Sequence, residues 1–177
     1  HLVTGEEITV KDLLYGLLIY SANDAAEVLA DNFEGGREEF VNEMNRKSSK
    51  LGLTDTLFNN PVGLDSNGHF TTAHDLAKIS TVAMKNPFFR DIVSTKEVIV
   101  TSIDGRFKHK LVNINELLGE VPGVLGIKTG WTESAKENLV TYIERGDRRV
   151  LIVLLVSEDR FGETKMLIDW IFSNFNW

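Results

Sequence analysis

Two short stretches of this sequence combine residue types that could do chemistry on a peptide or an acyl group. The first is Lys128-Thr129-Gly130, which follows a short apolar run and precedes Trp131. The ammonium supplies positive charge, the hydroxyl supplies a directed hydrogen bond, and glycine lets a ligand approach the backbone. This combination indicates a site that holds an anionic group. The alternative is a solvated lysine at the end of a strand.

The second stretch is Ser21-Ala22-Asn23, about a hundred residues earlier in the chain. If the backbone is extended here, residues two apart point to the same side, so a hydroxyl and an amide would be presented together. The alternative is that Ser21 and Asn23 cap the helix that follows, a common role of both residue types. Only the fold can bring the two stretches together.

The first half of the chain reads as helical. Apolar periodicity predicts helices over about 8–20, 24–33, 37–51 and 72–85, with a short helical turn through residue 92. Thr9 with Asp12, and Thr72 with Asp75, have the spacing of capping boxes at two of the helix starts. Residues 53–71 are rich in turn-forming residues and predict a long ordered loop.

The second half changes to the pattern of strands. Strands are predicted at 97–102, 107–112, 124–128, 139–144 and 149–156, followed by an amphipathic helix over 158–175. Asp104-Gly105 between the first two is a strong hairpin signal. We therefore predict an α+β fold in one domain, 1–177. A helical lobe at about 8–95 precedes a sheet lobe at about 96–177, whose antiparallel sheet is covered by the C-terminal helix.

Composition excludes several classes of function. The net charge of −7 argues against a nucleic-acid partner, because phosphate contacts need a basic surface. The chain has no cysteine, so it forms no disulfide and offers no thiolate to a metal. No apolar run approaches the roughly 20 residues of a membrane span.

Further segments accompany the two motifs in a recognisable order. They are residues 12–18, 21–26, 58–65, 72–77, 86–90, 92–95, 115–118, 123–132 and 167–170. These segments resemble the corresponding segments of the penicillin-binding D-alanyl-D-alanine carboxypeptidases. Relatives of that family carry the three motifs Ser-x-x-Lys, Ser-Asp-Asn and Lys-Thr-Gly. The resemblance implies a β-lactamase/transpeptidase-like fold and a serine-type hydrolase of the cell wall. The substrate would be a peptidoglycan stem peptide ending in D-Ala-D-Ala, and β-lactams would bind the full-length protein.

The resemblance also implies roles for the residues of both motifs. Ser21 would relay a proton towards the leaving amine, Asn23 would bind a backbone amide of the substrate, and Lys128 would supply positive potential. Thr129 and Gly130 would contribute to substrate binding, with Thr129 on the terminal carboxylate. The backbone N–H of Trp131 would be half of an oxyanion hole. No cofactor and no metal are implied, and the protein would be exported to the periplasm or the extracellular face of the cytoplasmic membrane.

The nucleophile that the resemblance requires is not in this sequence. No serine of the chain has a lysine three residues later, and Ser48-Ser49-Lys50 and Ser94-Thr95-Lys96 have the wrong spacing. We therefore expect the chain to begin after that motif, as an N-terminally truncated fragment that is inactive alone. Missing sheet neighbours would leave an unpaired edge, and self-association would cover it.

Other functions and other residues remain as alternatives. A β-lactamase or esterase of the same fold, or a non-catalytic homologue that binds peptidoglycan, would share these motifs. His69 and His74 raise the idea of a metal site, but a structural role is the commoner one for such a pair, and we predict no metal. Arg106 and Arg160 could help to attract an anionic substrate, but we interpret them as solvated surface residues. Residues 133–136 are interpreted as a loop beside the site.

Overall fold

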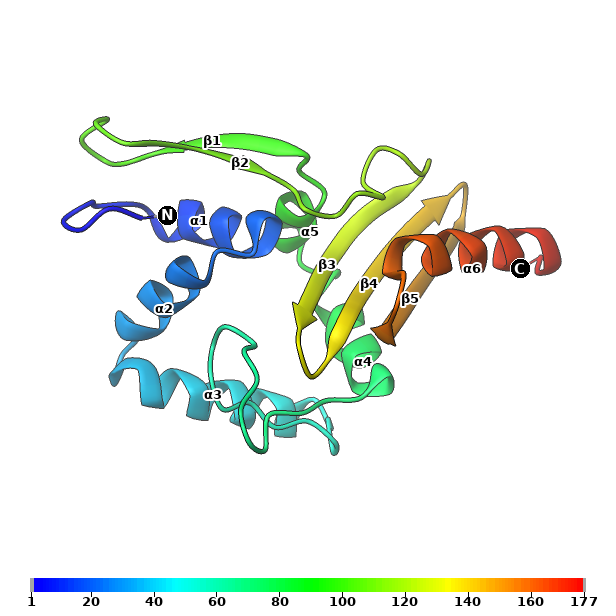
Figure 1. Ribbon diagram of the computed structural model, residues 1–177, viewed down its shortest axis with the longest axis horizontal. Coiled ribbons are helices and arrows are strands. Elements are labelled where there is room, and N and C mark those ends of the chain that lie inside the picture. The colour runs from blue at the N-terminus through cyan, green and yellow to red at the C-terminus, as the bar shows by residue number, and fades with distance from the viewer. Residues whose placement is uncertain (1, 177) are drawn as a thin grey trace.

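A three-stranded antiparallel sheet carries the Lys-Thr-Gly stretch (Figure 1). The computed structural model describes residues 2–176. Its main sheet consists, in spatial order, of β3 (Val124–Thr132), β4 (Lys136–Arg145) and β5 (Arg148–Ser157). Side chains alternate along β4, so Leu139 and Ile143 lie in one apolar cluster and Val140 and Tyr142 in another. The sheet therefore needs a cover on both faces.

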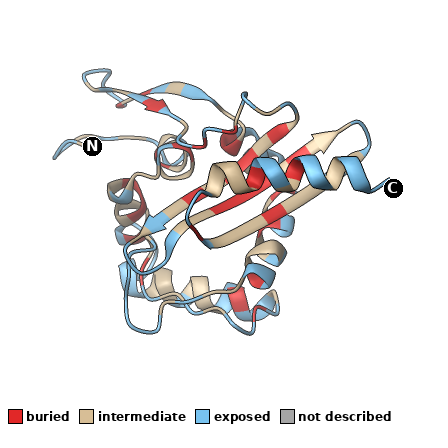
Figure 2. Cartoon of the chain, turned by 45° about the vertical axis from the view of Figure 1, so that its right-hand side comes forward, coloured by how far each residue is buried: buried red, intermediate tan, exposed pale blue. Residues whose placement is uncertain are grey.

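Helices supply both covers. On one face α6 (Arg160–Asn174) buries Ile168 against the cluster that holds Leu139 and Ile143, and Figure 2 shows buried residues of the sheet beneath this helix. On the other face lie α4 (Ala73–Ala83) and α5 (Pro87–Val93), where Val93 packs with Val140. The predicted covering by the C-terminal helix is confirmed.

The N-terminal half is helical, as predicted, but its first helix is not regular. The elements are α1 (Val10–Tyr15), the π-helical η1 (Gly16–Tyr20), α2 (Asn23–Asp31) and α3 (Gly36–Lys50). Thr9 caps α1 by accepting a hydrogen bond from the Asp12 N–H, as the sequence predicts. The wider π turn ends at Ser21 in a left-handed conformation, with φ 62° and ψ 39°. The break between the first two helices falls where it was predicted.

The hairpin around Asp104-Gly105 is also present. β1 (Glu97–Thr101) and β2 (Lys108–Val112) pair antiparallel in a sheet of their own, alongside α1 (Figure 1). Val100 and Leu111 bury their side chains with Ile19 of η1 and Ile92 of α5. The hairpin thus packs on the helical half, and the division into lobes at residue 95 stays a prediction.

One strand prediction was wrong in its extent. β3 was expected to end at Lys128, but its pairing with β4 continues through Thr132, which lies opposite Lys136. The turn that joins the two strands occupies only residues 133–135. Lys128, Thr129 and Gly130 therefore lie inside the strand, where the ladder fixes their backbone, and not at its end.

The α+β class predicted from the sequence is confirmed by this arrangement. Among the helices of residues 2–176, none is long and apolar enough to cross a membrane.

Candidate active site

Ser21 and Lys128 meet across the boundary between the helices and the sheet. The Lys128 Nζ lies 2.7 Å from the Ser21 Oγ, and it also donates a hydrogen bond of 2.7 Å to the Thr129 carbonyl oxygen. The two residues are 107 positions apart in the chain. The fold therefore joins the two stretches that the sequence singled out.

The backbone around Ser21 explains the direction of its side chain. The left-handed conformation of Ser21 turns the chain sharply between η1 and α2, and the Ala22 N–H bonds back to the Gly16 carbonyl oxygen at 3.0 Å. The N-cap of α2 is Ala22, whose side chain makes no capping hydrogen bond, and in the first turn it is the Asp24 Oδ1 that accepts from the Ala25 N–H at 2.9 Å. The alternative that Ser21 and Asn23 cap α2 is therefore wrong.

Asn23 is the first residue of α2, and its side chain is exposed at the same cleft as Ser21. Within residues 2–176 its amide has no hydrogen-bond partner, so it is available to a ligand. The amide offers two donors and an acceptor, as recognition of a peptide backbone requires.

The surroundings of Lys128 change its acidity. Burial lowers the pKa of its ammonium from the ordinary 10.5 to about 8, and the positive charge of Arg160 contributes in the same direction. At neutral pH the side chain is mostly charged, but it can release a proton far more readily than a solvated lysine. A lysine at this pKa, bonded to a serine hydroxyl, can exchange a proton with that hydroxyl.

This shift leads to a measurable titration. We expect the Lys128 side chain to lose its proton around pH 8. Because its pKa is lower folded than unfolded, the folded chain binds fewer protons between about pH 8 and 10.5, and this group's contribution to stability rises with pH across that window. NMR of ¹³C-lysine-labelled chain would follow the ε-carbons, with Lys128→Arg to assign the signal. Finding every lysine titrating above pH 10 would contradict the expectation.

Arg160 lies at the cleft, a role that the sequence offered only as the less favoured alternative. Its Nη1 donates a hydrogen bond of 3.0 Å to the Gly130 carbonyl oxygen, so its charge lies beside the strand that carries Lys128. The prediction that it is a solvated surface arginine was wrong, because the start of α6 aims it at β3. Arg106, by contrast, pairs with Asp104 at the tip of the hairpin, with its side chain 70% exposed.

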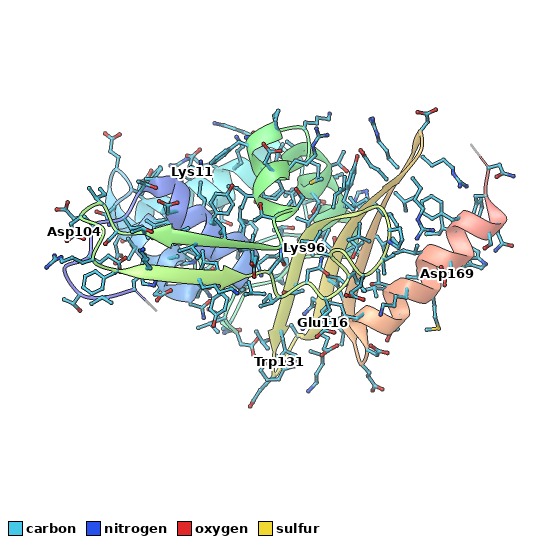
Figure 3. All side chains as sticks on the ribbon, turned by 90° about the horizontal axis from the view of Figure 1, so that it is seen from above. Lys11, Lys96, Asp104, Glu116, Trp131 and Asp169 are labelled. Atoms are coloured by element: carbon cyan, nitrogen blue, oxygen red, sulfur yellow. The ribbon has the colours of Figure 1, made fainter. Side chains whose placement is uncertain are left out.

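A cleft of about 610 Å³ separates β3 from the helical half. Its walls include Ser21, Asn23, Val62, Lys128, Thr129 and Trp131. Thr129 is only 5% exposed and forms part of the wall, whereas Trp131 is 62% exposed and projects outward from the end of β3 (Figure 3). Gly130 lies between them on the strand. All six residues predicted from the two motifs thus border one cleft.

The two histidines have structural contacts. The His69 Nδ1 accepts a hydrogen bond of 3.2 Å from the Asn59 N–H, and His74 is an exposed neighbour of Asp75 at the start of α4. Among the described residues, no three His, Cys, Asp or Glu side chains are grouped as a metal ion would need.

Lys128 and Arg160 supply positive charge to the cleft. This charge suits the binding of a carboxylate.

The chain is similar to known proteins over nearly its whole length. Residues 1–159 match the peptidase S11 family, described as D-alanyl-D-alanine carboxypeptidase. It is 36% identical over 174 residues to the D-alanyl-D-alanine carboxypeptidase DacF of Bacillus subtilis, covering 97% of this chain and 44% of that protein. It is 38% identical over 177 residues to DacB2 of Mycobacterium tuberculosis, with 96% and 60% covered.

Solved structures agree with these relatives. The crystal structure of the Streptomyces K15 DD-transpeptidase superposes with a TM-score of 0.93 at 33% identity, covering 98% of this chain and 71% of that one. The transpeptidase-like fold predicted from the sequence is therefore confirmed. The chain spans about half the length of DacF and of DacB2.

Proposed function

Because the chain belongs to the D-alanyl-D-alanine carboxypeptidase family, we propose that its cleft is one side of the active site of a serine-type D-Ala-D-Ala carboxypeptidase. The substrate would be a peptidoglycan stem peptide, and β-lactams would compete for the same cleft. The observation that carries this proposal is the 2.7 Å contact between Lys128 Nζ and Ser21 Oγ on the wall of the cleft. The activity is proposed for the whole protein, since the chain spans only part of its relatives.

The reaction would proceed through an acyl-enzyme. A serine outside residues 1–177 would attack the carbonyl between the two D-alanines, and its proton would pass to a basic partner. When the tetrahedral intermediate collapses, the leaving D-alanine nitrogen takes a proton from the Ser21 hydroxyl, which Lys128 replenishes. Water then hydrolyses the ester and returns the serine.

The remaining cleft residues would bind the substrate. Thr129 and the charges of Lys128 and Arg160 suit the terminal carboxylate, and the exposed amide of Asn23 suits the peptide backbone. The Trp131 N–H would donate to the developing oxyanion, a type of contact worth about 3–4 kcal/mol in acyl-transfer enzymes.

Labelling with a fluorescent penicillin, read by intact-mass spectrometry, tests the proposal. The chain 1–177 alone should form no covalent adduct, because no serine in it has a lysine three residues later. The complete gene should encode a Ser-x-x-Lys motif upstream of His1, and its protein product should form one adduct per molecule. A stoichiometric adduct on residues 1–177, or a complete gene without that motif, would overturn the proposal.

We also propose that the protein acts outside the cytoplasmic membrane, in the periplasm or at the extracellular face, where peptidoglycan lies. Fractionation of cells that express the complete gene would test this, and a cytoplasmic protein would contradict it.

The chain alone is further proposed to self-associate. Within residues 2–176, β5 pairs only with β4, so its other edge offers unpaired backbone groups, and Val156 near its end is 65% exposed. We expect dimers or larger species of residues 1–177 by light scattering at tens of micromolar. A monodisperse monomer at that concentration would exclude it.

A further inference from the structure

The loop that faces β3 across the cleft is held rigid by asparagine side chains. The Asn60 Oδ1 accepts hydrogen bonds from three successive backbone N–H groups, and its Nδ2 donates to the Leu64 carbonyl oxygen at 2.9 Å. The three donors are Val62, Gly63 and Leu64. The Asn59 Nδ2 closes the other side of the loop on the Asn67 carbonyl oxygen at 2.7 Å. Loop 59–69 therefore presents Asp65 from a fixed frame.

Asp65 joins its loop to Thr132, which lines the cleft at the end of β3. Its Oδ1 accepts a hydrogen bond of 2.7 Å from the Thr132 hydroxyl, and its Oδ2 accepts one of 3.2 Å from the Ser134 N–H. The Thr132 Oγ1 in turn accepts from the Ala135 N–H at 2.9 Å. The hydrogen bonds from Thr132 and Ser134 to Asp65 join loop 59–69 to the β3–β4 hairpin. The Thr132 hydroxyl and the Ser134 N–H also lower the pKa of Asp65, so its carboxylate is charged at neutral pH.

The Thr132–Asp65 contact has a counterpart on the same strand, β3, in the Lys128–Ser21 contact. Lys128 and Thr132 are four residues apart in β3, so both side chains point to the same side, one towards Ser21 and the other towards Asp65. Gly130 lies midway between them and has no side chain to fill the space. The Lys128–Ser21 contact involves groups of the proposed chemistry, whereas the Thr132–Asp65 contact involves none of them.

We propose that Asp65 is a positioning residue, which fixes the outer end of β3 against loop 59–69 and so sets the width of the cleft that receives the peptide. This inference rests on the proposed function for the identity of the ligand. Both oxygens of Asp65 are already engaged by the hairpin, which favours positioning over direct contact with a substrate amine. Without the carboxylate, the rigid loop and the hairpin would be free to separate at that end.

The test uses the chain 1–177 with Asp65→Ala and Asp65→Asn, and Asp169→Ala as the control. Asp169 is an exposed aspartate on α6 whose side chain points away from the molecule (Figure 3). Two quantities are measured by NMR: the exchange rate of the Ser134 amide hydrogen, and the affinity for an N-acylated peptide ending in D-Ala-D-Ala. We expect Asp65→Ala to raise the exchange rate of the Ser134 amide hydrogen about tenfold. It should lower the affinity for the peptide about five- to tenfold. The melting temperature should be unchanged.

Asp65→Asn separates positioning from a general loss of order. Asparagine keeps one acceptor for the Thr132 hydroxyl, so affinity should recover at least partly. Thr132→Ala should lower the affinity for the peptide as much as Asp65→Ala does. The double variant should bind the peptide no more weakly than either single variant. Equal affinity of wild type and Asp65→Ala, or additive losses in the double variant, would overturn the proposal. If the wild-type product of the complete gene binds no such peptide, the proposed function fails. An unchanged Ser134 exchange rate in Asp65→Ala would separately refute the positioning contact between Asp65 and the hairpin.

Discussion

Replacing Lys128 by alanine is expected to reduce the rate of acylation by penicillin about 10²- to 10³-fold in the complete protein. The substitution removes the ammonium that bonds the Ser21 hydroxyl at 2.7 Å, and with it the proton source for the leaving group and the positive charge of the cleft. The loss corresponds to about 3–4 kcal/mol of transition-state stabilisation. Stopped-flow acylation of the product of the complete gene would measure it.

The stability of the same variant should not fall. Burial holds the pKa of Lys128 at about 8, so the charged side chain carries a desolvation cost that alanine does not. We therefore expect the activity to drop while the melting temperature stays level or rises, which separates a role in the site from a role in folding.

Two further lysine variants make the comparison specific. Lys165 is an exposed lysine on α6, and Lys165→Ala should acylate like the wild type. Lys128→Arg keeps the charge but replaces a compact ammonium by a planar group that does not release its proton, so it should recover only a small part of the rate. A Lys128→Ala protein that retains more than half of the wild-type rate would show that Lys128 has no part in the chemistry.

The features that could be predicted from the sequence are those determined by neighbours in the chain. Thr9 and Thr72 cap α1 and α4 because each side chain reaches the N–H three residues ahead, and both starts were predicted. The hairpin at Asp104-Gly105 follows in the same way, since the turn residues specify it. Alternating and helical periodicities likewise gave the order of the elements and the α+β class.

The features that could not be predicted depend on contacts between distant residues. The extension of β3 to Thr132 results from its pairing with β4, and the polar sequence after Lys128 gives no sign of it. The left-handed Ser21 follows a π turn that its local sequence does not indicate. Asp65 lies in a stretch that reads only as turn chemistry, and Arg160 in one that reads as a helix start. Their partners are 67 and 30 residues away, so the fold had to be known first.

The packing beneath Ser21 should be as important to the site as the polar residues. Ile19 is fully buried in the cluster formed with Ile92, Val100 and Leu111, and its carbonyl oxygen accepts a hydrogen bond of 3.0 Å from the Ile114 N–H. Ile19→Ala would leave a cavity between η1 and the hairpin and is expected to lower the free energy of unfolding by about 2–4 kcal/mol. Urea denaturation of the chain would measure this loss.

Ile99→Ala is the matched control, because this isoleucine of β1 is 63% exposed and should cost no more than about 1 kcal/mol. Ile19 precedes Ser21 by two residues, so a loosened η1 should also loosen the contact of Ser21 with Lys128. Water would then reach the ammonium more easily, and the Lys128 titration should move upward from about pH 8 in Ile19→Ala but not in Ile99→Ala. Equal losses of stability in the two variants, with an unchanged Lys128 titration in both, would mean that the buried cluster does not hold the serine in place.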